Sequence, residues 1–316
     1  MINLARKIYK KTFGFPKRTY FNVHPADYKG QDVADLIYEE LQSGKPLMIS
    51  RMGRTEFSCV NFYKKTRNGR VQRDWNYIRG RIDKFDYDPT DVHKIHQNAG
   101  FFPPTHDKLD QFSELMLDCL PQIDILASII NLENEFGEEL RQAKRIWFED
   151  LNPYYHQRPW SRILKGKKVL VIHPFTASIK SQFEKRELIF ENPDILPEFE
   201  LITYTPVQSI AGNYKSLPYK DWFEALESMK SDISKLDFDV ALIGCGAYGM
   251  PLAAHVKQLG KQGIHIGGAI QILFGILGKR WESEYDISHL VNDNWVRPMV
   301  TEIPDNHNLV EGGCYW

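Results

Sequence analysis

The fold is decided by residues 240–249, VALIGCGAYG. An apolar run typical of a buried strand passes into a GxGxxG motif that begins at Gly244, and the helical pattern 250–259 follows directly. Glycines at this spacing let the backbone approach a ligand phosphate, and a helix N-terminus adds unpaired N–H groups. We predict a nucleotide-binding turn formed by Gly244, Gly246 and Tyr248. The alternative is that the glycines only allow the strand and the helix to pack closely.

Strand and helix patterns alternate on both sides of this turn. Strands are expected at 46–50, 145–150, 168–173, 199–203, 239–244 and 263–266. Helices are expected at 32–41, 57–65, 89–97, 105–120, 176–190, 222–236, 250–259 and 269–277. Because parallel strands need long crossovers, usually helical, this alternation predicts an α/β fold, a Rossmann-like parallel sheet with helices on both faces.

The division of the chain follows from breaks in these patterns. Residues 1–30 show no clean period and are expected to form an N-terminal arm. Residues 31–285 are expected to form one domain, whose halves 31–160 and 161–285 meet near a proline-containing segment. The tail 286–316 is expected to pack on the domain; the alternatives are a lid or a contact with a second subunit.

Composition excludes several classes of protein. The chain has 316 residues, 40 Lys or Arg and 41 Asp or Glu, so a domain-wide basic field for nucleic acid is not expected. Its four cysteines show no metal or disulfide spacing. The longest apolar run, 267–278, is too short to span a bilayer, and residues 1–13 lack the features of an export signal. We expect a cytoplasmic protein with no transmembrane segment.

One charged stretch stands out. Residues 64–84, KKTRNGRVQRDWNYIRGRIDK, contain eight Lys or Arg and two Asp, with two aromatic residues between them. A solvated surface loop is one interpretation. The other is a patch for phosphate, glycan or anionic lipid, which would allow peripheral contact with the inner face of a membrane.

Other expected strand ends carry further candidate residues. His173 ends one strand and is a candidate base or phosphate contact, although a hydrogen-bonded structural role is the alternative. Ser178 lies in the helix that follows. Gly267 and Gln271 lie in a third turn of the same kind. Because the carboxyl ends of parallel strands share one edge, we expect these loops to converge on a nucleotide pocket.

The first expected strand leads into Arg51-Met52-Gly53-Arg54-Thr55-Glu56. This segment and the later GCGAYG block resemble the R-x-G-D-G-E segment and the glycine turn of the GT-D class of bacterial glycosyltransferases. The resemblance implies a Rossmann-like enzyme that transfers a sugar from a nucleotide-sugar donor to a glycan acceptor in surface polysaccharide or glycoprotein assembly. Arg51, Gly53 and Glu56 match the family's residues, whereas Arg54 replaces its Asp.

The substitution changes the expected chemistry. The family's Asp is associated with a metal and a diphosphate, and a guanidinium can neutralise a diphosphate without a metal. We therefore expect Arg51 and Arg54 to hold the leaving diphosphate of a donor, most simply a UDP-sugar, without a divalent metal. Glu56 is the candidate base, with His173 as the second candidate. Alternatively, Glu56 only stabilises the start of a helix.

Two other classes remain open. A Rossmann-like oxidoreductase or methyltransferase would use the same glycine turn, but such enzymes usually carry an acidic residue at the end of the next strand, and none is present there. A non-catalytic nucleotide-binding protein of a glycan assembly complex is the other alternative. The nucleotide base, the sugar, the acceptor, the anomeric outcome and the oligomeric state are not predicted.

Overall fold

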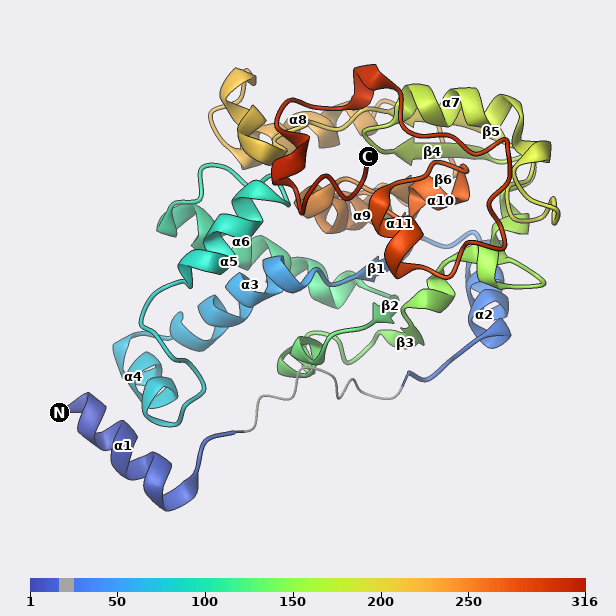
Figure 1. The fold of residues 1–316 in the computed structure, drawn as a ribbon. Helices are drawn as coiled ribbons and strands as arrows, with labels where there is room; N and C mark the ends of the chain where they lie inside the picture. Colours follow the sequence, from blue (N-terminus) through green and yellow to red (C-terminus); the bar gives the residue numbers. More distant parts are fainter. Residues whose placement is uncertain (17–25) are drawn as a thin grey trace.

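A seven-stranded sheet forms the centre of the computed structural model, which describes residues 1–16 and 26–316 (Figure 1). The strand order is β3-β2-β1-β7-β6-β4-β5, and every pair is parallel. The strands are β1 (Leu47–Arg51), β2 (Ile125–Ser128), β3 (Lys144–Trp147), β4 (Lys168–Ile172), β5 (Glu200–Tyr204), β6 (Val240–Ile243) and β7 (Gln262–His265). The predicted α/β class is confirmed. Residues 17–25 of the expected arm, which include Lys17 and Arg18, lie outside the described residues.

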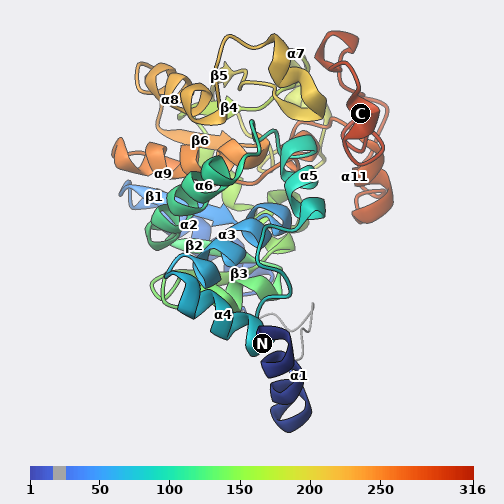
Figure 2. The same cartoon turned by 90° about the vertical axis from the view of Figure 1, so that its left-hand side faces the viewer.

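Helices cover both faces of this sheet (Figures 1 and 2). They are α1 (Ile2–Phe13), α2 (Gln31–Gln42), α3 (Arg54–Thr66), α4 (Arg70–Ile78), α5 (Pro89–Gln97), α6 (His106–Cys119), α7 (Thr176–Glu184), α8 (Trp222–Ile233), α9 (Gly249–Gln258), α10 (Ile270–Leu273) and α11 (Lys279–Glu284). One core layer joins the sheet to α3, α5, α6, α8 and α9, and the other joins it to α2, α7 and α10. Alternate strand residues supply the two layers: Met48 enters the first, whereas Leu47 and Ile49 enter the second.

Several element predictions were wrong. The sequence analysis left out β2, whose four residues Ile125–Ser128 are all buried. Residues 2–13, expected to be irregular, form α1, and residues 70–78 of the basic stretch form α4 rather than a loop. The helix expected over 269–277 is only the short α10, because Gly275 has a φ of +64° that breaks the helical path. Among the described helices, none is long and apolar enough to cross a membrane.

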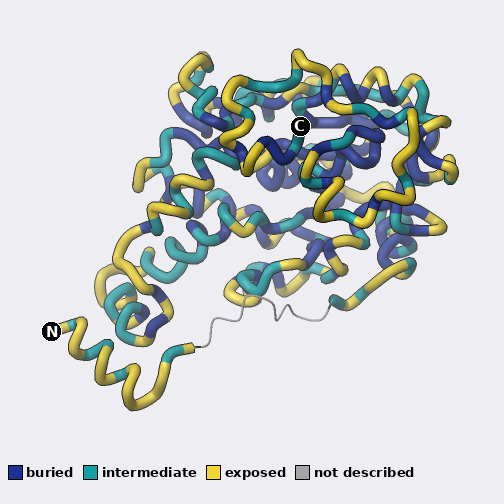
Figure 3. Tube along the Cα trace, in the orientation of Figure 1, coloured by how far each residue is buried: buried dark blue, intermediate teal, exposed yellow. Residues whose placement is uncertain are grey.

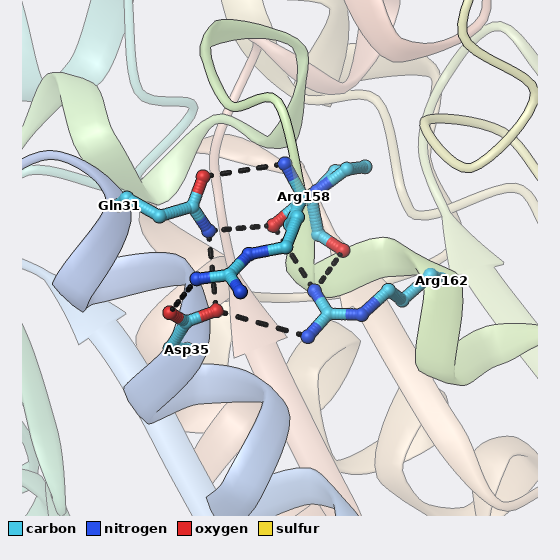
Figure 4. A network of polar contacts seen from close by, with 5 residues as sticks. Gln31, Asp35, Arg158 and Arg162 are labelled. Carbon is cyan, nitrogen blue, oxygen red and sulfur yellow. Dashed lines mark hydrogen bonds and ion pairs between the residues drawn. The ribbon is translucent and has the colours of Figure 1, made fainter.

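A polar network and a buried indole join the segment between the expected halves to α2. Asp35 accepts hydrogen bonds from Arg158 at 2.7 Å and from Gln31 at 3.2 Å, and Arg162 lies 3.7 Å away (Figure 4). Trp160, two residues after Arg158, is completely buried, and its indole N–H donates to the Leu151 carbonyl at 2.8 Å. Trp160, at the end of the segment between the expected halves, is thus part of the core, and one sheet contains strands from both halves.

We predict that Trp160→Ala lowers the free energy of unfolding by about 3–5 kcal/mol, because it leaves a large cavity and removes a buried hydrogen bond. Urea unfolding followed by circular dichroism measures this change. Trp75→Ala is the matched control: the Trp75 side chain is half exposed, so its loss should cost less than about 1 kcal/mol. Equal losses in the two variants would contradict this assignment of the core.

Candidate functional site

The strand order reverses between β4 and β6, and a pocket lies at that point. After β4 the chain crosses outward to β5, whereas after β6 it crosses inward to β7, so the two following loops separate. A pocket that is open to solvent lies between them, and the empty space of about 610 Å³ there includes solvent outside its mouth. Its walls come from the loops after β4, β5, β6 and β7, from the two residues after α5 and from the C-terminal residues.

The pocket wall is mostly apolar and carries no charged side chain. Its residues are Asn98, Ala99, His173, Pro174, Phe175, Val207, Gln208, Ser209, Ile210, Gly244, Cys245, Gly246, Tyr248, Gly268, Gln271, Tyr315 and Trp316. Among these described residues there is no Lys, Arg, Asp or Glu. A wall of rings, amides and hydroxyls suits an uncharged ring with hydrogen-bonding groups better than it suits a phosphate.

Five predicted site residues meet in this wall: His173, Gly244, Gly246, Tyr248 and Gln271. The two glycines also have a packing role. A Cβ on Gly244 would lie 2.5 Å from the Gly267 carbonyl oxygen, and a Cβ on Gly246 would lie 3.0 Å from that of Ala99. Gly246 also has a φ of +58°, which favours glycine. Close packing therefore explains these glycines without a ligand, although their turn still borders the pocket.

His173 is a neutral imidazole with a defined tautomer. The Phe175 backbone N–H donates to its Nδ1 at 3.1 Å, so the proton of the neutral ring is on Nε2. Burial lowers the pKa of His173 to about 3. This ring therefore offers the pocket a hydrogen-bond donor, and it is a weak base.

Gln271 leaves an acceptor without a partner. Its side chain is completely buried, and its Nε2 donates to the Tyr315 carbonyl at 2.9 Å. Its Oε1 accepts no hydrogen bond from any described residue. A buried amide oxygen without a partner is costly, so a ligand N–H that reaches it would gain a strong contact.

A second group of predicted residues lies beside the pocket at the end of β1. Gly53 precedes α3, and the Glu56 carboxylate folds over it so closely that a Cβ on Gly53 would lie 2.2 Å from the carboxylate. Burial raises the pKa of Glu56, while its own backbone N–H and the charge of Arg51 oppose that change. Glu56 is therefore a better base than an exposed carboxylate.

Arg51 connects this group with the pocket through Gly267. The Arg51 guanidinium lies 4.8 Å from the centre of the Phe148 ring. Its Nη1 lies 3.2 Å from a Cβ built on Gly267, whose carbonyl oxygen contacts Gly244. Gly267 therefore lies close both to Arg51 and to Gly244, a residue of the pocket wall.

Arg54 and Ser178 are not among the residues that line the pocket. Arg54 is the first residue of α3 and is exposed. Burial raises the pKa of Asp91 in α5, and the charge of Arg54 opposes that rise with a smaller effect. Ser178 and Ala177 bind the carboxylate of Glu302: the Ala177 N–H donates to it at 2.7 Å, the Ser178 N–H donates at 3.3 Å, and the Ser178 hydroxyl donates as well. A tail carboxylate thus occupies the N-terminus of α7.

The sequence analysis missed the contribution of the tail to the pocket. Tyr315 and Trp316 line it, and the Trp316 indole N–H donates to the Glu302 carbonyl at 3.3 Å. The aromatic residues at the end of the chain could have indicated this role, but the sequence there has no regular period from which the positions of the two rings could be predicted. Ser209 was missed because it lies in an irregular loop; its hydroxyl donates to the Gly100 carbonyl at 2.6 Å.

No metal centre is evident in the described part of the chain, where no three His, Cys, Asp or Glu residues group as ligands. The chain matches no known family model, and searches of curated proteins and of solved structures found no significant match either.

We predict that Glu302→Gln loosens the tail. Glutamine keeps the shape of the side chain but removes the charge that favours a helix N-terminus, so the free energy of unfolding should fall by about 1 kcal/mol. Hydrogen exchange of residues 299–316 should become faster. Glu184→Gln, at the opposite end of the same helix, is the control and should leave tail exchange unchanged. Unchanged tail exchange in Glu302→Gln would contradict the capping role.

We predict that His173→Asn reduces the acid sensitivity of the fold. His173 titrates near pH 6.5 in the unfolded chain but near 3 in the folded one, so the unfolded state gains a proton first as the pH falls. Stability should therefore decrease below about pH 6.5, by about 2 kcal/mol at pH 5. An Asn Oδ1 still accepts the Phe175 N–H, and the variant should lose the contribution of His173 while keeping that of His265, whose pKa burial also lowers to about 3.

Urea unfolding at pH 7 and pH 5 measures the effect. His93→Asn is the control, because His93 is an exposed residue of α5 and its replacement should leave the pH dependence as in the wild type. If His173→Asn and the wild type lose the same stability between these pH values, His173 is not buried in the neutral form.

Proposed function

We propose that the protein is a glycosyltransferase that takes a sugar from a nucleotide-sugar donor, in the assembly of a bacterial surface polysaccharide or glycoprotein glycan. The observation that carries the proposal is the uncharged pocket at the reversal of strand order, with a buried acceptor on Gln271 and the charge of Arg51 on the adjoining side. A nucleotide sugar has the matching division into an uncharged ring and a charged diphosphate.

Each part of the donor has a proposed contact. The Oε1 of Gln271 accepts a ring N–H, as uracil would supply from N3, and the Nε2–H of His173 donates to a carbonyl or a hydroxyl. Arg51 stabilises the diphosphate as the bond to the sugar breaks. Glu56, with its raised pKa, takes the proton of the acceptor hydroxyl. A UDP-sugar is the donor that this arrangement favours, and Arg51 supplies positive charge without a metal.

We predict that variants of Arg51 and Gln271 differ in which ligand they bind more weakly, as measured by calorimetric titration. Arg51→Ala should weaken binding of a UDP-sugar about tenfold or more, because it removes a charge-assisted contact, but should change uridine binding little. Gln271→Leu should weaken both ligands, because the ring N–H loses its acceptor. Arg141→Ala, which removes an exposed guanidinium, is the control and should bind like the wild type. A panel of UDP-, GDP-, CMP- and dTDP-sugars identifies the base.

The same proteins test whether the site is catalytic. Glu56→Gln should bind the donor but lose most of its transfer to acceptor, since a general base contributes about 10²–10⁴-fold to the rate. Binding without hydrolysis or transfer by the wild type would assign the protein to the non-catalytic class. No thermal stabilisation by any of the four nucleotide sugars would contradict the proposed function itself.

A further inference from the structure

Helix α1 has one face fixed against the protein. The guanidinium of Arg6 donates to the Ile82 carbonyl and to the Asp83 carboxylate, both at 2.8 Å. It also lies 4.6 Å from the centre of the Phe15 ring and 4.3 Å from that of Tyr77, an α4 residue. These contacts hold α1 beside α4, where both views show it projecting from one end of the molecule (Figures 1 and 2).

The opposite face of α1 is apolar and uncovered. Leu4 and Ile8, one helical turn apart, are 63% and 58% exposed. Lys7 and Lys11 are exposed on the same side of the helix, so a short apolar stripe has lysines along its border. Figure 3 shows this helix as largely exposed along its length.

Helix α4 repeats the pattern. Val71 and Trp75 are also one turn apart, and their side chains are 73% and 50% exposed. The Arg79 guanidinium lies 5.1 Å from the centre of the Trp75 ring, and Arg67 is exposed at the preceding turn. We call the exposed side chains of α1 and α4, together with Arg67 and Arg79, the basic end.

Positive charge is concentrated in these segments. Residues 1–16 contain four Lys or Arg and no Asp or Glu, and residues 64–84 contain eight Lys or Arg and two Asp. The whole chain has a formal net charge of −1, so the remainder is acidic. Within the described residues, no carboxylate forms an ion pair with Lys7, Lys11, Arg67 or Arg79. The basic end is therefore available for an anionic partner.

We infer that the basic end docks on the surface of an anionic lipid bilayer. A helix with an apolar stripe bordered by lysines lies in the plane of the interface, with its apolar side chains at the boundary of headgroups and acyl chains. The lysine and arginine head groups then reach lipid phosphates, and a tryptophan is favoured at this depth. Duplex nucleic acid would attract the same charge but would leave Leu4 and Ile8 in water. This inference does not depend on the proposed function.

Vesicle flotation with the full chain tests the inference. The wild type should float with vesicles that contain about 30% phosphatidylglycerol in phosphatidylcholine and not with phosphatidylcholine alone, and binding should weaken as salt screens the charges. Leu4→Glu with Ile8→Glu should reduce binding about tenfold or more, because two apolar side chains no longer enter the interface. Lys7→Glu with Lys11→Glu should reduce it at least as much.

The matched control is Leu188→Glu with Leu309→Glu, which adds the same charge at two exposed leucines outside the basic end and should reduce binding only slightly. Circular dichroism and the thermal midpoint establish that each variant is folded. Three results would overturn the inference: no flotation of the wild type with anionic vesicles, undiminished binding by the Leu4 and Ile8 variant, or an equal loss in the control. Tight binding to duplex RNA that this variant keeps, without flotation, would instead identify a nucleic-acid partner and would also overturn it.

Discussion

The parallel direction of all seven strands is the constraint on which the rest of this structure depends. Because every strand ends at the same edge, the loops after β1, β4, β6 and β7 open side by side, although they are far apart in the sequence. The reversal of strand order between β4 and β6 then separates two of these loops and leaves space for a pocket. No single motif creates this site, since each loop supplies only part of its wall.

The charged side chains of the site and its uncharged hydrogen-bonding groups lie in two separate places. On the β1 side, Arg51 and Glu56 form a charged group, whereas the pocket itself has an uncharged wall with one buried acceptor on Gln271. Gly267 lies close both to Arg51 and to Gly244 of the pocket wall. The C-terminal tail completes the pocket with Tyr315 and Trp316, and Glu302 fixes that tail to the first turn of α7. The N-terminus of α7, which contains the candidate residue Ser178, thus binds part of the chain itself.

The local pattern of apolar residues predicted the strands well where turn residues marked both ends of the strand. It failed for β2, because a run as short as Ile125–Ser128 cannot be told from part of a helix by its periodicity. Spacing alone put Arg51 and Arg54 in one loop, whereas in the structure β1 ends at Arg51, α3 begins at Arg54, and neither arginine lines the pocket. The role of the tail depends on contacts across more than 120 residues, such as that between Glu302 and Ser178, and no local period encodes them.

A structure of the complex with the UDP-sugar tests the central claim most directly. The account predicts a ring N–H within about 3 Å of the Gln271 Oε1 and the diphosphate beside Arg51. A nucleotide bound elsewhere on the molecule, with the Gln271 oxygen still without a partner, would contradict it.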